Sequence, residues 1–129
     1  TAIHAAELVT AIRRPALPAG AGGAYRKLAQ PASGYAMVGV CAIIARAGGR
    51  IEHARVALTG VSDSAYRATA VEEGLLGTDG SPDVIAAAAA EATVNRSVNS
   101  DIHADRAYRT AMAEVYTRRA VQAALERSS

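Results

Sequence analysis

Two apolar segments separated by Gly48-Gly49 constrain the fold of this chain more than any other feature. Residues 36–45 are almost unbroken apolar, which predicts a buried strand, and the glycine pair suits a tight reversal. Residues 51–61 alternate between apolar and more polar side chains and predict the partner strand. We therefore expect an antiparallel hairpin with one buried face.

A further strand is expected before this hairpin. Residues 7–13 include β-branched side chains and end at Arg14-Pro15, and proline closes a strand because it cannot donate to a sheet ladder. Residues 18–23 contain several glycines, but no helical pattern follows them, so the dinucleotide-binding fingerprint is not met. The sequence thus predicts a strand, a long loop and then the hairpin.

The first helix is expected over residues 67–76. Its apolar side chains recur at helical spacing, and Gly77 provides a stop signal. Glu72 and Glu73 are assigned to its solvent side. Because adjacent helical residues point about 100° apart, this pair has poor geometry for joint acid and base catalysis.

Two more helices follow. Ser81-Pro82-Asp83 combines a capping hydroxyl, an N-terminal proline and an acid, and predicts a helix that continues to about residue 94. Residues 104–126 predict the third helix, with an expected ion pair between Asp105 and Arg109 and with an apolar stripe that includes Tyr108, Met112, Val115, Tyr116 and Ala120. The expected fold class is α+β: a small three-stranded antiparallel sheet with three helices packed on one face, in a single domain comprising residues 1–129.

Composition excludes several classes of protein. Fourteen basic and twelve acidic residues leave a net charge of +2, which is too weak and too dispersed for a nucleic-acid surface. The apolar runs fall well short of the roughly 20 residues that cross a bilayer. Without Phe or Trp, the core must be built from small aliphatic side chains and tyrosine. Cys41, the single cysteine, fits a reducing compartment, so a cytoplasmic location is expected, and its apolar strand indicates an inert core thiol.

Candidate catalytic and metal-binding groups are few. His4, His53 and His103 are far apart in the sequence, and none has the paired spacing of a zinc site. Asp101, His103 and Asp105 alternate as potential ligands and come closest to a metal cluster. An acidic helix start with a capping aspartate explains the same residues without a metal.

The order of several segments resembles the C-terminal domain of the FAD-binding medium subunit of molybdenum hydroxylases, the family that includes aerobic carbon monoxide dehydrogenase and xanthine dehydrogenase. The similarity covers nearly the whole chain. It is carried by Glu7-Leu8-Val9-Thr10-Ala11-Ile12-Arg13, Tyr25 to Ala36, Ala54-Arg55-Val56-Ala57-Leu58-Thr59-Gly60-Val61, Arg67 to Gly77, Tyr108-Arg109 and Arg118-Arg119-Ala120.

The resemblance implies a cofactor-binding role for Tyr35 and Lys27. In the family, a Tyr-x-Lys stretch followed by an aromatic or aliphatic residue and alanine meets the flavin, and here these positions are Tyr25, Lys27 and Tyr35-Ala36. An ammonium group stabilises negative charge on reduced flavin or its phosphates, and an amphipathic ring packs against the isoalloxazine. Many relatives carry a basic pair after the lysine and an acid before the aromatic residue, whereas this chain has Gln30-Pro31 and Gly34.

The resemblance also implies a place in a larger enzyme. The domain would close over FAD and dock an iron–sulfur small subunit and a molybdenum large subunit, so that electrons pass from two-iron two-sulfur clusters to flavin and then to an external acceptor. The family's N-terminal FAD-binding domains are absent from these 129 residues, so we expect the chain to share FAD with them and to be inactive alone. The open alternatives are a structural, subunit-docking domain without cofactor contact and a free-standing ligand-binding protein.

Overall fold

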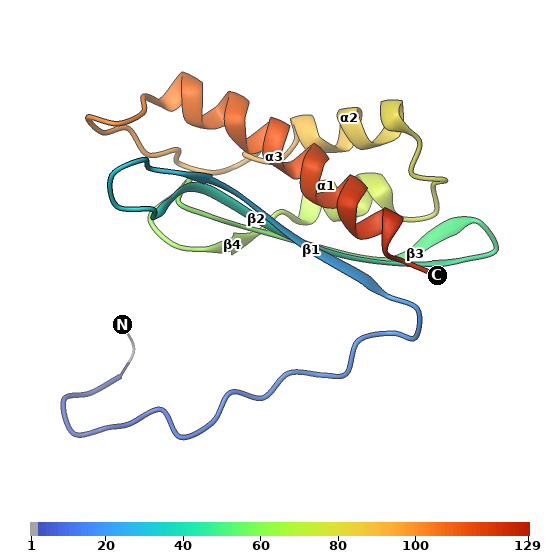
Figure 1. The fold of residues 1–129 in the computed structure, drawn as a ribbon, viewed down its shortest axis with the longest axis horizontal. Helices are drawn as coiled ribbons and strands as arrows, with labels where there is room; N and C mark the ends of the chain where they lie inside the picture. The colour runs from blue at the N-terminus through green and yellow to red at the C-terminus, as the bar shows by residue number, and fades with distance from the viewer. Residues whose placement is uncertain (1–2) are drawn as a thin grey trace.

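The computed structural model describes residues 3–129, which form an antiparallel sheet covered on one face by helices (Figure 1). Within these residues the sheet has four strands in the order β1-β2-β3-β4. The strands are β1 (Gly22–Ala29), β2 (Ala36–Ala47), β3 (Arg50–Thr59) and β4 (Tyr66–Arg67). The α+β class is confirmed, but the expected count of three strands is wrong.

The predicted hairpin is confirmed as β2 and β3. Its strands turn at Gly48-Gly49, and the register places Ala47 opposite Arg50 and Val40 opposite Leu58. Both glycines have positive φ, which explains why this reversal is made of glycine. The side chains of β2 that point to the helices are fully buried and consist of Val38, Val40, Ala42 and Ile44.

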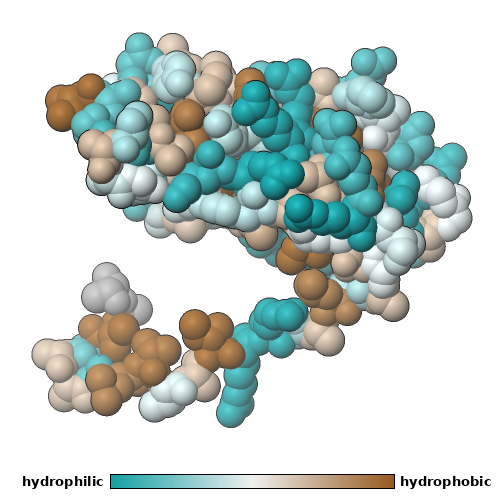
Figure 2. All heavy atoms as spheres, in the orientation of Figure 1, coloured by the Kyte–Doolittle hydropathy of each residue, from teal (hydrophilic) through white to brown (hydrophobic). Residues whose placement is uncertain are grey.

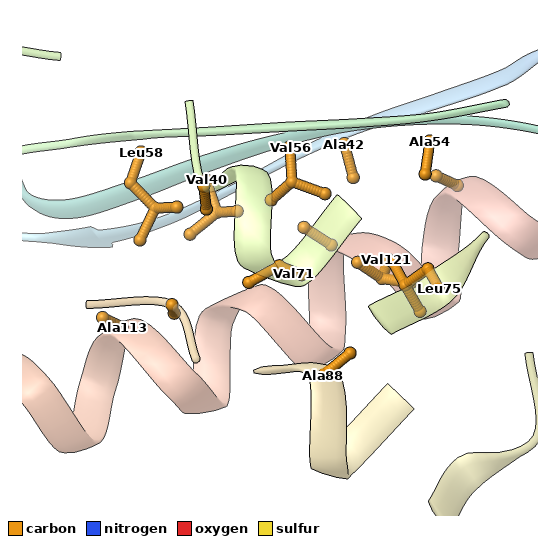
Figure 3. Packing of buried hydrophobic residues seen from close by; sticks show 14 of the residues in the cluster. Val40, Ala42, Ala54, Val56, Leu58, Val71, Leu75, Ala88, Ala113 and Val121 are labelled. Atoms are coloured by element: carbon orange, nitrogen blue, oxygen red, sulfur yellow. The ribbon is translucent and has the colours of Figure 1, made fainter. Parts of the chain in front are cut away.

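The helices within the described residues are α1 (Thr69–Leu75), α2 (Pro82–Ala90) and α3 (Arg106–Glu126). Helix α3 packs on β1 and β2, α1 packs on β3, and α2 packs on the other two helices. Figure 3 shows Val71 of α1 and Val121 of α3 within the cluster of buried side chains beneath the strands, with Ala88 of α2 farther from the sheet. None of these helices is long and apolar enough to span a bilayer.

Helix α3 lies close to β1. Its buried residues include Ala113, Thr117, Ala120 and Ala124, so small side chains face the strands. At Gly22, the first residue of β1, an added Cβ would lie 2.1 Å from the backbone oxygen of Ala124. The small side chains of α3 and the glycine at the start of β1 let the two backbones approach this closely. Of the expected apolar stripe, Ala120 is fully buried and Met112 and Tyr116 pack against the core, but Tyr108 is 45% exposed.

The strand expected over residues 7–13 is wrong. Residues 3–21 contain neither helix nor strand, and the side chains of Leu8 and Ile12 are 88% and 92% exposed. Figure 2 shows apolar residues along this segment, away from the main body. β-branched residues favour a strand only where a neighbouring strand pairs with them. The first strand is instead β1, in a region expected to be loop.

Strand β4 and the residues around it were also missed. Tyr66 and Arg67 pair with Leu58 and Ala57. The first helix therefore begins at Thr69 rather than at the expected residue 67. A two-residue strand is too short to show periodicity. Cys41 is exposed rather than a core thiol, because the register places it on the sheet face opposite the helices.

Glu72 is buried, contrary to its expected solvent position. Its Oε1 accepts hydrogen bonds from the backbone N–H of Val56, at 2.9 Å, and from Nε of Arg67, at 3.0 Å. Burial alone would raise the pKa of the Glu72 carboxyl, but the Arg67 hydrogen bond, the Val56 N–H and the Arg55 charge together lower it. The Glu72 carboxylate therefore accepts a hydrogen bond from the Val56 N–H of β3, a donor that the two-residue strand β4 is too short to pair.

Replacing Glu72 by Gln should destabilise the domain by about 1 to 3 kcal/mol at pH 7, because charge-assisted hydrogen bonds are lost. A carboxyl whose pKa is lowered by folding contributes stability above its unfolded pKa, near 4.5, and loses it as pH falls through the folded pKa. The difference between wild type and E72Q should thus shrink as the pH falls below about 4.5 in urea unfolding. The exposed neighbour variant E73Q is the control. A constant difference across this pH range would contradict the assignment.

Thr117 gives a second stability prediction. It is fully buried in α3, and its hydroxyl has no hydrogen-bond partner. T117V removes the unpaired hydroxyl at nearly constant shape and should raise the free energy of unfolding by about 1 kcal/mol. The exposed variant T110V on the same helix should change it by less than about 0.5 kcal/mol. A less stable T117V would show that the hydroxyl is paired in solution.

Candidate cofactor-facing site

Tyr35 lies at the end of a compact loop that connects β1 to β2. The backbone N–H of Gln30 donates to the carbonyl oxygen of Tyr35 at 2.9 Å, and the N–H of Gly34 donates to the carbonyl of Gln30 at 2.8 Å. The Gln30 side chain also accepts from the backbone and hydroxyl of Ser33. Gly34 has φ of +73°, a conformation that glycine adopts without strain. The loop thus holds Tyr35 with 43% of the residue exposed.

Lys27 is brought to the same loop from β1. Its Nζ donates a hydrogen bond to the carbonyl oxygen of Gly34 at 2.8 Å. The Lys27 ammonium group therefore lies next to Gly34, the residue that precedes Tyr35. In this arrangement the ammonium group braces the loop that carries Tyr35.

The buried side chain of Arg109 holds the backbone just after Tyr35 and the loop before α3. Its side chain is 3% exposed, and Nη1 donates to the carbonyl oxygens of Met37 and Gly60, each at 2.9 Å. Nη2 donates to Oδ2 of Asp101. The expected pair between Asp105 and Arg109 is wrong, because Asp105 caps α3 by accepting from the N–H of Tyr108 at 2.7 Å.

Asp101 organises the loop before α3. Its Oδ1 accepts from the backbone N–H groups of His103, at 2.9 Å, and Ala104, at 3.0 Å. The His103 N–H and the Arg109 guanidinium lower the pKa of the Asp101 carboxyl, although partial burial opposes them. Among residues 3–129, no group of three potential ligands is placed to hold a metal ion. Asp101 instead fixes the backbone that presents His103.

The two loops meet through their rings. The centroids of the Tyr35 and His103 rings are 6.2 Å apart, and the ring planes are inclined at 64°, an edge-to-face arrangement. Next to this pair is a hollow of about 530 Å³, lined by Gln30, Pro31, Met37, His103, Ala104, Asp105 and Tyr108. Sequence reasoning considered His103 only as a metal ligand. The aromatic pair joins residues 68 positions apart and left no local sequence signal.

The chemistry of the hollow suits one part of FAD. Aromatic and apolar groups such as Tyr108 and Met37 favour a flat ring system. No lysine or arginine is among the residues lining it, and Lys27 is already engaged with Gly34. The described residues thus fit contact with an isoalloxazine, whereas the pyrophosphate needs other protein groups.

A second hollow, of about 540 Å³, lies between α2 and α3 and includes Arg118 and Arg119. Both cations have partners on α3. Arg118 lies 4.0 Å from Glu114, four residues earlier on the helix, and the guanidinium of Arg119 lies 5.1 Å from the centroid of the Tyr116 ring. This groove is far from Tyr35 in the fold and contributes nothing to the site.

Comparison with known proteins identifies the domain. The model of the CO dehydrogenase flavoprotein C-terminal domain family matches residues 23–124. The carbon monoxide dehydrogenase medium chains of Afipia carboxidovorans and Hydrogenophaga pseudoflava are 36% and 33% identical over 99% and 98% of this chain. The chain spans 44% of the length of each relative.

The fold agrees with a solved structure of the same kind. Carbon monoxide dehydrogenase from Hydrogenophaga pseudoflava, in a form lacking the Mo-pyranopterin moiety of the molybdenum cofactor, superposes with a TM-score of 0.83. Sequence identity is 37%, over 89% of this chain and 40% of that chain. The chain therefore belongs to the CO dehydrogenase flavoprotein C-terminal domain family, found in the FAD-binding medium subunits of molybdenum hydroxylases.

Proposed function

We propose that these residues form the part of an FAD-carrying medium subunit that closes over the flavin, with Tyr35 contacting the isoalloxazine. The observation that carries the proposal is the position of Tyr35: a half-exposed ring on a loop fixed by backbone hydrogen bonds, in edge-to-face contact with His103. His103 lines a hollow that also includes the aromatic ring of Tyr108, apolar Met37, and polar Gln30 and Asp105. The family match supports the cofactor, because its members are flavoproteins by description. An exposed ring on a fixed loop suits ligand binding, because little conformational entropy is lost when the ligand binds.

Lys27 has a supporting role in this proposal. Its hydrogen bond to Gly34 holds the loop, so its first contribution is to the position of Tyr35. Its positive charge, close to the same loop, also favours electron-rich reduced flavin through electrostatics. The partner of the ammonium group at Gly34 is a backbone carbonyl oxygen.

Other domains would complete the FAD site. The hollow beside Tyr35 offers no cradle of cations for a pyrophosphate. The relatives are more than twice as long as this chain, which leaves room for domains that bind the phosphates. FAD, when bound, supplies the redox chemistry, passing electrons from iron–sulfur clusters to an external acceptor. The residues described here bind and orient one face of its ring.

The carbon monoxide dehydrogenase relatives support a proposal about partner subunits. We infer docking to an iron–sulfur small subunit and to a large subunit with the molybdenum cofactor, the cofactor named for the Hydrogenophaga pseudoflava enzyme. Residues 3–21 expose the apolar side chains of Leu8, Val9 and Ile12, which favours a contact with other protein surface (Figure 2). Cytoplasmic location stays a prediction.

A structural docking domain without cofactor contact is the second candidate. It is favoured by the same exposed apolar segment and by the sheet face that the helices leave uncovered (Figure 1). In that case Tyr35 would be a surface residue with no effect on flavin. The two candidates differ in a measurable way.

We expect Y35A in the complete medium subunit to weaken FAD binding about tenfold, because a ring-on-ring contact and its buried area are lost. K27M should have a smaller effect of the same sign, through a looser loop. Titration of the apo-subunit with FAD, followed by quenching of flavin fluorescence, measures both changes.

The control is L76A, which truncates a side chain with 42% exposure at the end of α1, outside the loop of Tyr35 and the lining of the hollow. It should leave FAD affinity and flavin reoxidation unchanged. If Y35A and K27M also left both unchanged, the docking domain would be the better account.

A further inference from the structure

The loop of residues 100–105 is held firmly although its surface is exposed. Asp101 accepts hydrogen bonds from the backbone of His103 and Ala104, and its own N–H donates to the carbonyl of Ala104 at 3.1 Å. Just before the loop, the N–H of Asn99 donates to the carbonyl of Val61 at 2.8 Å. The backbone under His103 is therefore fixed at several points.

One buried side chain connects this loop to the loop of Tyr35. Arg109 donates to the carboxylate of Asp101, two residues before His103. It also donates to the carbonyl of Met37, two residues after Tyr35. The backbones that carry both rings are thus tied to the same guanidinium group. Arg109 therefore holds the backbone beside each member of the edge-to-face pair, and His103 of that pair lines the hollow.

The His103 side chain is not needed to hold the fold together. The residue is exposed, and the hydrogen bond that it donates to Asp101 comes from its backbone N–H rather than from its ring. Its ring contacts the ring of Tyr35 edge-to-face. By occupying one edge of the tyrosine, His103 limits the rotamers that Tyr35 can adopt toward the open hollow.

We propose that His103 is a positioning residue for the flavin, which acts by holding the Tyr35 ring in the orientation that meets the isoalloxazine. This inference rests on the proposed function, because it needs Tyr35 to contact FAD. It adds a second segment of the chain, residues 100–105, to a site otherwise built from the loop between β1 and β2. Aromatic shape is the property that matters, so phenylalanine should replace histidine.

The test is a double-mutant cycle in the complete medium subunit, with FAD affinity measured by quenching of flavin fluorescence. H103A should weaken FAD binding about 2- to 12-fold, the range of one aromatic pair converted to affinity. H103F should restore it. I102A, which truncates a side chain with 95% exposure in the same loop, is the matched control and should match wild type. In a Y35A background, H103A should have no further effect.

Two further readouts separate positioning from a structural role. Urea unfolding of H103A should match wild type, and the NMR signals of the Tyr35 ring in the FAD-free chain should shift in H103A but return in H103F. If H103A leaves FAD affinity unchanged while Y35A weakens it, the role of His103 is wrong and the proposed function stands. If H103A weakens binding equally in the Y35A background, His103 does not act through Tyr35. If Y35A has no effect, the proposed function itself fails.

Discussion

The side chain of Arg109 enters the domain where the sheet meets the start of α3, and both halves of the candidate site depend on its hydrogen bonds. One nitrogen binds the carbonyls of Met37 and Gly60, and another binds Asp101. Gly60 makes room for this arrangement: its φ is +78°, and an added Cβ would lie 2.2 Å from the carbonyl oxygen of Ala36. A buried guanidinium requires such partners, because an unpaired charge is costly to bury. The position of Tyr35 beside His103 follows from this anchor.

Sequence periodicity predicted those parts of the fold whose signals are local. The hairpin across Gly48-Gly49 and the helix after Ser81 depend on neighbouring residues, and the structure contains both. Glu72 shows the limit. Its place on the helix looked exposed, but the short strand β4 leaves the N–H of Val56 without a strand partner, and Glu72 supplies the missing acceptor. That need arises only once the sheet has formed.

The candidate site also contains residues that the sequence predicted and residues that it did not. Tyr35 and Lys27 were predicted through a family resemblance, and the Lys27 side chain reaches from β1 to the loop that carries Tyr35. Arg109 and His103 were missed in these roles because their partners lie 72 and 68 positions away in the sequence. The large apolar residues of α3 suggested a buried stripe, whereas the buried face uses Ala113 and Thr117 with Arg109 at its start. Small residues facing a sheet carry little signal in a helical pattern.

A crystal structure of the complete medium subunit with FAD bound would test the central claim most directly. The account predicts that the Tyr35 ring lies within about 4.5 Å of the isoalloxazine, the range of apolar contact, with His103 still edge-on to the tyrosine. A flavin ring remote from residues 30–35, with Tyr35 covered by another protein surface instead, would contradict it.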